Sequence, residues 1–227
     1  MSSTFLESMT STGVHWRLGE QHHFDGITGD RGSPPSVPVL SEGLRRTRTV
    51  ARNWVRDLVT SRLALDWAGF EETSAGRKPR LRGLPSVDVS ISHSGRMLLV
   101  AVVRGGRLGV DVEDEPFDVF GRPSLVRRMC SGPERDQLAS LPEPSRRRTL
   151  ARIWTLKEAA LKAIGVGLAV DPRRIVVPEP LTSSRTVGPE RSIVHLTTGT
   201  AHVFRPESGR NDEALSVWRG LHAEWSG

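Results

Sequence analysis

Hydrophobic residues recur at helical spacing in three segments of the chain. Over residues 41–65 they alternate with arginines, which predicts an amphipathic helix with one basic face. Over residues 148–164 one face carries the side chains of Ile153, Leu156, Ala160 and Ile164, so this helix is expected to be anchored on a core. A shorter helix is predicted at residues 133–141.

A two-residue alternation of apolar and polar positions marks the strands. Residues 87–91 alternate, residues 97–103 are almost continuously apolar, and residues 108–113 alternate again. This pattern predicts a hairpin with a deeply buried second strand, a turn at Gly105, and a third strand. Further strands are predicted at residues 14–18, 174–177, 192–197, 201–204 and 215–218.

The order of these elements, a helix followed by strands, occurs twice and divides near Gly105. We therefore predict an α+β protein built from two similar halves. Residues 1–13 are rich in Ser and Thr and are expected to form a loose tail, followed by an N-terminal half at 14–105 and a C-terminal half at 106–227.

Composition excludes several classes of protein. The chain has 227 residues, 37% of them hydrophobic, with no apolar run long enough to span a membrane and no secretory leader, so we expect a protein of the cytoplasm. Its one cysteine, Cys130, supplies neither an internal disulfide nor a zinc site and is expected to pack in a core.

Lysine is rare in this basic chain. Among 32 basic residues only Lys78, Lys157 and Lys162 are lysines, against 26 acidic residues and a net charge of +6. A codon bias towards arginine accounts for the ratio but not for the positions that keep lysine. Because an ammonium is a compact charge that arginine does not replace, these three positions are candidates for chemistry.

Asp111 and Glu113 lie two positions apart on a predicted strand. Their side chains then share one face, with backbones about 7 Å apart, and two such carboxylates favour a bound cation. Hard oxygen ligands select Mg²⁺ or Mn²⁺. The alternative, an ordinary solvated strand face, is the commoner meaning of such a pair.

A second candidate set lies on the helix at residues 148–164. Trp154, Glu158 and Lys162 are spaced four apart and form one stripe. Glu158 is a candidate third carboxylate for the metal of Asp111 and Glu113, while Lys157 and Lys162 are candidates to hold phosphate oxygens. The alternative is an exposed Glu–Lys pair that stabilises the helix by about 0.3–0.5 kcal/mol.

Two loops offer groups that bind anions. The first concentrates cations around a proline, and the second offers hydroxyls and an imidazole beside a glycine. Either loop alone is a weak signal, because exposed cations and single histidines are common. Together with the carboxylates they suggest a polyphosphate site. The residues are Arg77, Lys78, Pro79, Arg80 and Leu81 in the first loop, and Ser92, His93 and Ser94 in the second.

These segments resemble the motifs of the 4'-phosphopantetheinyl transferases. LGVDVE at residues 108–113 and WTLKEAALK at 154–162 are similar to the two signature motifs, and ISHSG at 91–95 is similar to the motif that precedes them. With the loop at Lys78 and the helical Arg48, the resemblance covers residues 45–177. The chain length is typical of the surfactin-synthetase-activating type, a pseudodimer with its active site between the halves.

The resemblance implies a transfer of phosphopantetheine from coenzyme A to a serine of an acyl or peptidyl carrier protein. Arg48, His93, Ser92 and residues 77–81 would bind coenzyme A, and Asp111, Glu113 and Glu158 would hold Mg²⁺, or Mn²⁺, under its pyrophosphate. Glu158 would be the general base, and Lys162, with Lys157, would stabilise the departing 3',5'-ADP. Carriers of this kind are acidic, and the enzyme would act as a monomer.

Two features leave alternatives open. A basic cluster that the family uses for the 3'-phosphate is replaced by a Pro- and Gly-rich loop, with Arg45 and Arg46 as unranked substitutes. Glu134 occupies the position of a further acidic residue in some members, but Pro133–Glu134 is equally a helix start.

Other classes of protein are less consistent with the sequence. Nucleic-acid binding is suggested by the basic charge, but 5% aromatic residues and no tyrosine provide few stacking platforms, and no membrane partner is expected. A Mg²⁺-dependent nuclease or phosphodiesterase would use similar carboxylates. Release of 3',5'-ADP that requires an apo carrier protein distinguishes transfer from hydrolysis.

Overall fold

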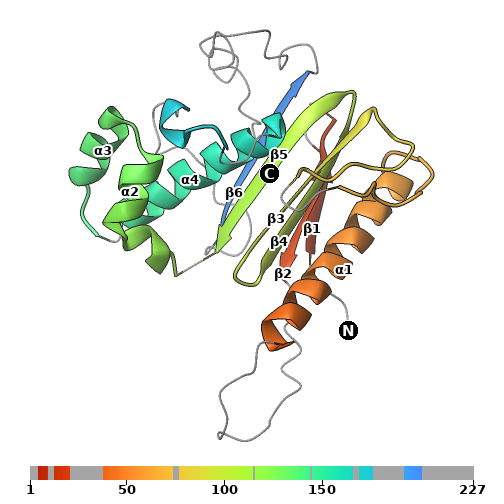
Figure 1. Cartoon of the computed structure of the whole chain (residues 1–227), viewed down its shortest axis with the longest axis horizontal. Coiled ribbons are helices and arrows are strands. Elements are labelled where there is room, and N and C mark those ends of the chain that lie inside the picture. The colour runs from red at the N-terminus through yellow and green to blue at the C-terminus, as the bar shows by residue number, and fades with distance from the viewer. Residues whose placement is uncertain are drawn as a thin grey trace, which may run out of the picture.

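The computed structural model describes residues 5–9, 13–20, 38–73, 77–114, 116–143, 145–165, 169–175 and 192–200. These residues form an α+β fold (Figure 1). Its strands are β1 (Phe5–Met9), β2 (His15–Glu20), β3 (Val87–Ser94), β4 (Met97–Arg104), β5 (Gly106–Asp114) and β6 (Ser192–Thr200). Its α-helices are α1 (Pro38–Ser61), α2 (Pro123–Met129), α3 (Gly132–Ala139) and α4 (Ser145–Ile164).

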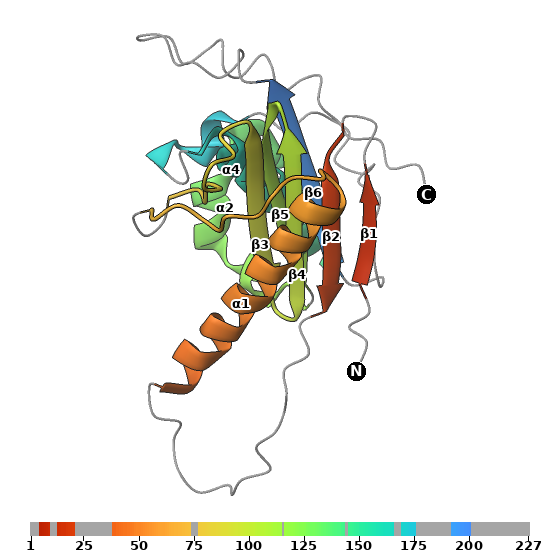
Figure 2. The same cartoon turned by 90° about the vertical axis from the view of Figure 1, so that its right-hand side faces the viewer.

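The strands form two sheets. The first has four antiparallel strands in the order β1-β2-β4-β3, and the second pairs β5 with β6. Helix α1 packs on one face of the four-stranded sheet, whereas β5 packs on the other and α4 covers β5 and β6 (Figure 2). The layers are therefore α1, the large sheet, the small sheet and α4.

The apolar pattern of the sequence explains these layers. The buried stripe of α1, which includes Trp54, Val55 and Leu58, packs on side chains such as Val89 and Val100. On the opposite face of the sheet, the alternating residues of β5 pack on β2 and β4. That second core contains Leu108, Val110 and Val112 with Trp16, Leu18, Leu99 and Ala101.

Helices α2 and α3 form a third core with the first half of α4. Phe120, Met129, Leu138 and Leu150 pack there, together with Cys130. The packing role expected for Cys130 is confirmed, and burial raises the pKa of its thiol to about 11. Two short 3₁₀ helices, Asp118–Gly121 and Pro172–Arg174, flank this lobe in the sequence.

Several sequence-based boundaries are corrected. Phe5–Met9, expected in a loose tail, form the outer strand β1, because an edge strand can be held by its backbone ladder to β2 without a strong apolar pattern. Helix α2 was not predicted. Arg174, expected to begin a strand, ends a 3₁₀ helix instead, since Pro172 and the Asp171 side chain initiate one there. The strands expected at 201–204 and 215–218 lie outside the described residues.

Candidate functional site

Helix α4 lies unusually close to β5, and a glycine makes this possible. A Cβ built on Gly109 would be 1.8 Å from the Ala159 carbonyl oxygen and 2.4 Å from the Ala163 nitrogen. Only a residue without a side chain fits between the two backbones. The contact turns the Trp154, Glu158 and Lys162 stripe of α4 towards the polar face of β5.

Asp111 is the centre of the resulting cluster. It is 4% exposed, and its Oδ1 accepts hydrogen bonds from Lys162 Nζ at 2.5 Å and from Ser92 Oγ at 2.7 Å. Lys162 Nζ also donates to Ser92 Oγ at 2.9 Å. One hydrogen-bonded cluster is thus built from three polar side chains, one each from β3, β5 and α4.

Glu113 lies two residues after Asp111, on the same face of β5. Its Oε2 accepts a hydrogen bond from Ser94 Oγ at 2.6 Å, and the Trp154 side chain donates another. The pKa of Glu113 is raised to about 7, mainly by burial and also by the Asp111 charge, although the hydrogen bonds from Ser94 and Trp154 oppose the rise. A partly buried carboxyl of this kind favours a neighbouring cation.

Glu158 extends the cluster from the helix. Burial raises its pKa, the negative charge of Asp111 raises it further, and Lys162 opposes the change. The pKa of Asp111 is also raised by burial, against the effects of Lys162 and Ser92. Asp111 acts on both glutamates, so the three predicted carboxylates lie within electrostatic range of one another.

The chemistry of the three carboxylates fits a divalent cation. Within the described residues, no group of three or more His, Cys, Asp or Glu side chains already has the spacing of a metal site. The donor set nevertheless fits a hard cation, because all three groups are carboxylates whose ionised forms are disfavoured by burial. Among the described atoms, Asp111 Oδ2 is also buried without a hydrogen-bond partner. That oxygen is available to a cation.

The opposite side of the cluster is electropositive. Burial lowers the pKa of His93, and the charges of Lys162 and Arg48 lower it further. These two cations from α4 and α1 therefore act on one exposed imidazole at the end of β3. The arrangement is suited to an anion beside the carboxylates, and the binding of a phosphate by Arg48 and His93 stays a prediction.

The basic loop at residues 77–81 is only partly available to a ligand. Arg77 and Arg80 are exposed. Lys78 is not, because its ammonium is paired with Asp88 and donates to the Leu108 carbonyl at 2.7 Å. Leu81 is 2% exposed and belongs to the core under α1. The expected contacts of the Lys78 and Leu81 side chains with coenzyme A are corrected accordingly.

Lys157 is placed away from the cluster. It is 0% exposed, and its ammonium binds Glu134 Oε2 and the Met129 carbonyl, both at 2.7 Å. Glu134 also accepts from the Ser131 amide in a capping box, which confirms that it begins a helix. A role for Lys157 in holding phosphate is incompatible with this burial, and the sequence-based expectation is corrected.

Sequence reasoning named Ser92 and Ser94 as groups that bind an anion, but it missed that these serines of β3 hydrogen-bond to Asp111 and Glu113 of β5. Ser90 Oγ accepts from the Val110 amide at 3.0 Å, and Ser94 and Trp154 hold Glu113. The signal was present in the alternation, which places Asp88, Ser90, Ser92 and Ser94 on the same face of one strand. When the polar face of a strand is buried, its side chains require hydrogen-bond partners.

Comparisons with known proteins find similarity over the part of the chain that contains this site. A family model described as the 4'-phosphopantetheinyl transferase superfamily matches residues 107–217, a range that includes Asp111, Glu113 and Glu158. None of the described helices is long and apolar enough to cross a membrane.

Three relatives illustrate the similarity. The chain is 31% identical over 99 residues to 4'-phosphopantetheinyl transferase psf-1 of Bacillus pumilus, covering 43% of this chain and 40% of the relative. It is 36% identical over 85 residues to 4'-phosphopantetheinyl transferase HetI of Nostoc, covering 35% and 33%. A rat L-aminoadipate-semialdehyde dehydrogenase-phosphopantetheinyl transferase is 30% identical over 137 residues, covering 55% and 44%. The chain spans less than half the length of each relative.

Proposed function

Because a model of the 4'-phosphopantetheinyl transferase superfamily matches residues 107–217, we propose that the chain belongs to this superfamily and transfers 4'-phosphopantetheine from coenzyme A to a serine of an apo acyl or peptidyl carrier protein. The products would be the holo carrier protein and 3',5'-ADP. One observation carries the proposal: Asp111 of β5 is paired with Lys162 of α4, and its charge acts on both Glu113 and Glu158.

Coenzyme A would lie across the electropositive side of this cluster. Arg48 and His93, which share one electrostatic field, would bind the 3'-phosphate. The exposed Arg77 and Arg80 would line the adenine end. Asp111, Glu113 and Glu158 would hold Mg²⁺ or Mn²⁺, and the bound ion would neutralise charge on the pyrophosphate.

Proton transfer and charge stabilisation are assigned to two residues of α4. Glu158, whose pKa is raised by burial, would accept the proton of the carrier serine, directly or through water. The serine oxygen would then bond to the β-phosphorus as the bond from phosphorus to the bridging oxygen breaks. Lys162, 30% exposed beside Asp111, would stabilise the charge on the 3',5'-ADP that leaves.

The arrangement of the elements supports the pseudodimeric type. α1 covers the four-stranded sheet that contains β3 and β4, and α4 covers the smaller sheet of β5 and β6, so a helix packs on a sheet in each half. The site residues come from both sides of the turn at Gly105. A single chain would then supply both halves of the site and act as a monomer.

The direct test is incubation with coenzyme A, Mg²⁺ and a panel of apo carrier proteins, followed by mass spectrometry of the carriers. We expect a mass increase equal to one phosphopantetheine on at least one acidic carrier, with 3',5'-ADP released in equal amount. Release of 3',5'-ADP without any carrier would instead establish hydrolysis. If none of the apo carriers that a known transferase modifies gains this mass, the proposal is contradicted.

Removing the carboxylates should abolish transfer without unfolding the chain. We expect Glu158→Gln to lower kcat by about 10²–10⁴-fold, because a general base is lost. Asp111→Asn should also raise the Mg²⁺ concentration needed for half-maximal rate. Circular dichroism and thermal unfolding provide the folding control, and a Glu158→Gln variant with full activity would exclude Glu158 as the base.

Lys162→Arg tests whether an ammonium is needed at this point. The Lys162 nitrogen contacts both Asp111 and Ser92 within 3 Å. A planar guanidinium is larger and displaces the carboxylate it binds, so we expect a loss in kcat of about 10²-fold with the positive charge retained. Steady-state kinetics measure the change. A silent Lys162→Arg variant would show that charge alone is sufficient.

A further inference from the structure

Lys78 makes contacts within the protein that differ from the coenzyme A contact implied by the resemblance to the transferases. Its Nζ donates to the Leu108 carbonyl at 2.7 Å and forms an ion pair with Asp88 Oδ2. Asp88 Oδ2 in turn accepts from the Leu108 amide at 2.7 Å. The pair therefore satisfies both backbone polar groups of one residue of β5.

This contact is the first in a series that holds β5 to β3. The two strands belong to different sheets, and side chains of β3 bind the amides of β5. Asp88 accepts from Leu108, Ser90 from Val110 at 3.0 Å, and Ser92 from Val112 at 3.4 Å. Each contact joins residues twenty positions apart, so one register relates the strands throughout.

The register decides whether the site assembles. A shift of one residue moves every side chain of a strand to the opposite face. With the observed register, Asp111 meets Ser92 and Glu113 meets Ser94. In the later contacts the β3 side chain is an uncharged serine hydroxyl, whereas in the first contact it is Asp88, which is paired with Lys78.

The end of α4 is held at the same place. The Arg107 guanidinium donates to the Ile164 carbonyl at 3.0 Å, and a Cβ on Gly165 would be 3.8 Å from Lys78 Cδ. Lys162 lies within the same helical turn. One group of contacts therefore fixes β3, β5 and the part of α4 that bears Lys162.

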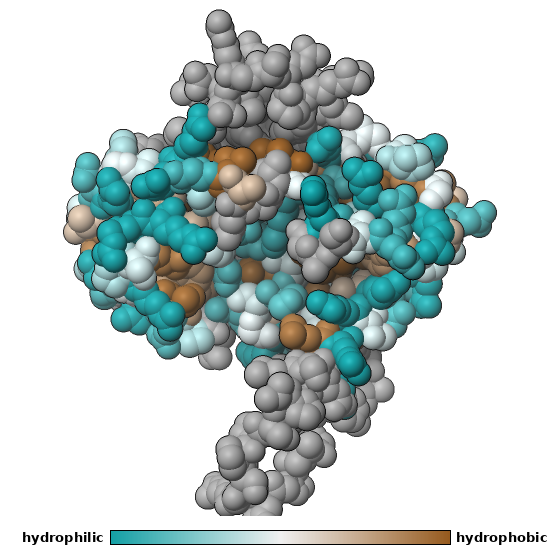
Figure 3. Space-filling model, in the orientation of Figure 1, coloured by the Kyte–Doolittle hydropathy of each residue, from teal (hydrophilic) through white to brown (hydrophobic). Residues whose placement is uncertain are grey.

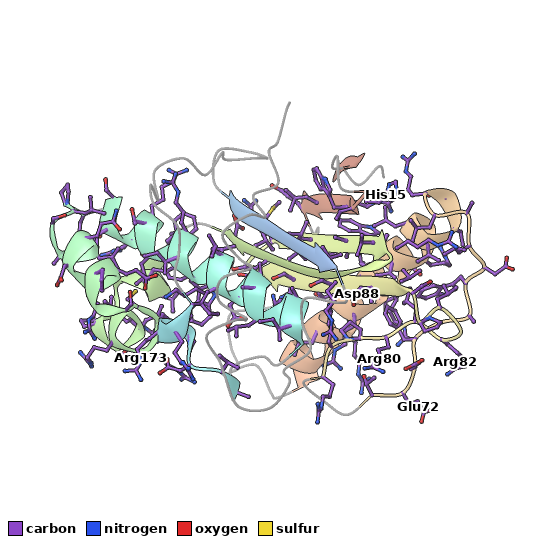
Figure 4. The ribbon with its side chains drawn as sticks, turned by 90° about the horizontal axis from the view of Figure 1, so that it is seen from above. His15, Glu72, Arg80, Arg82, Asp88 and Arg173 are labelled. Atoms are coloured by element: carbon purple, nitrogen blue, oxygen red, sulfur yellow. The ribbon has the colours of Figure 1, made fainter. Side chains whose placement is uncertain are left out.

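Burial separates Lys78 from the other cations nearby. The side chains of Lys78 and Asp88 are 18% and 20% exposed. Figure 4 shows Asp88 near the middle of the molecule, whereas Arg80 and Arg82 project at its side. Burial also lowers the pKa of Lys78, and Asp88 opposes that change.

We infer that Lys78 is a positioning residue that fixes the register of β5 on β3, and hence of Asp111 on Ser92 and Lys162, and that it does not hold a phosphate of coenzyme A. The effect on turnover rests on the proposed function. The register itself is independent of that function.

The experiment is a double-mutant cycle of Lys78→Met, Asp88→Asn and the pair. Transfer is assayed well below the Tm of every variant, and hydrogen exchange is measured at the amides of Leu108 and Val110. If Lys78 sets the register, each single variant loses about tenfold or more in kcat and exchanges faster. The double variant is no worse than the worse single one, and KM for coenzyme A stays within about twofold.

Arg82→Met is the matched control, because Arg82 is an exposed cation of the same region. It should leave kcat, KM and amide exchange unchanged. A tenfold or greater rise in KM for Lys78→Met alone, with Asp88→Asn silent, would overturn the inference and make Lys78 a ligand contact. Unchanged exchange at Leu108 in Lys78→Met would also overturn it. If the unmodified chain transfers nothing, the proposed function fails, but the exchange cycle still tests the register.

Discussion

Two lysines on one helix have opposite environments. Lys157 and Lys162 are five positions apart, so they point about 140° away from each other around α4. Lys162 reaches Asp111 and is 30% exposed, whereas Lys157 is fully buried against Glu134. Burying an ammonium is costly unless it is paired, and two contacts of 2.7 Å provide that pairing. Lys157 therefore belongs to the core of the α2–α3 lobe.

This placement makes Lys157 a stability residue. We expect Lys157→Met to lower the free energy of unfolding by about 3–5 kcal/mol, because Glu134 is left as an uncompensated buried charge. Adding Glu134→Gln, which keeps an acceptor for the capping box, should restore much of the loss. Urea unfolding measures both. A double variant less stable than Lys157→Met would mean that the pair is not the source of the effect.

At the scale of elements, the site depends on the contact between α4 and β5. Gly109 permits this contact, and the atoms that a Cβ would strike belong to the α4 backbone. Backbone moves less readily than a side chain, so the helix as a whole would have to shift. Such a shift would separate the Lys162 stripe from Asp111.

Gly109→Ala tests this contact. We expect it to lower the free energy of unfolding by about 3 kcal/mol or more and to abolish transfer in any folded fraction. Gly43→Ala is the control, because a Cβ at Gly43, in the second turn of α1, meets nothing within 4 Å. That change should be neutral or slightly stabilising. Thermal unfolding compares the two, and equal effects would contradict the packing argument.

The sequence predicts the elements better than the contacts between them, because its patterns record local structure. Periodicity predicted the β3–β4 hairpin, β5 and α4, and it placed Glu158 and Lys162 on one stripe, because helical and strand repeats are local properties. It did not predict that Lys157 meets Glu134 or that Lys78 meets Asp88. Those pairs join separate elements, and their partners are decided by tertiary packing.

At the scale of the whole molecule, the excess of positive charge would favour an anionic partner. The chain carries a net charge of +6, and on the face shown in Figure 3 hydrophilic side chains surround scattered hydrophobic patches. Helix α1 contributes several exposed arginines, and one of them, Arg48, acts on His93 at the site. An acidic carrier protein would therefore meet a favourable field on the side where coenzyme A is proposed to bind.

Because of this field, we predict an effect on the rate at which the carrier protein associates, not on its affinity. Long-range attraction accelerates encounter and is screened beyond about 8–10 Å at physiological ionic strength. We expect kcat/KM for an acidic apo carrier to fall by about tenfold or more between low and physiological salt, with kcat nearly unchanged. Replacing the exposed Arg45 and Arg52 of α1 by Gln should flatten this dependence, whereas Gln at the exposed Arg173, in the other lobe, should not. A kcat/KM that is independent of salt would show that the arginines serve no steering function, because screening acts on every exposed charge.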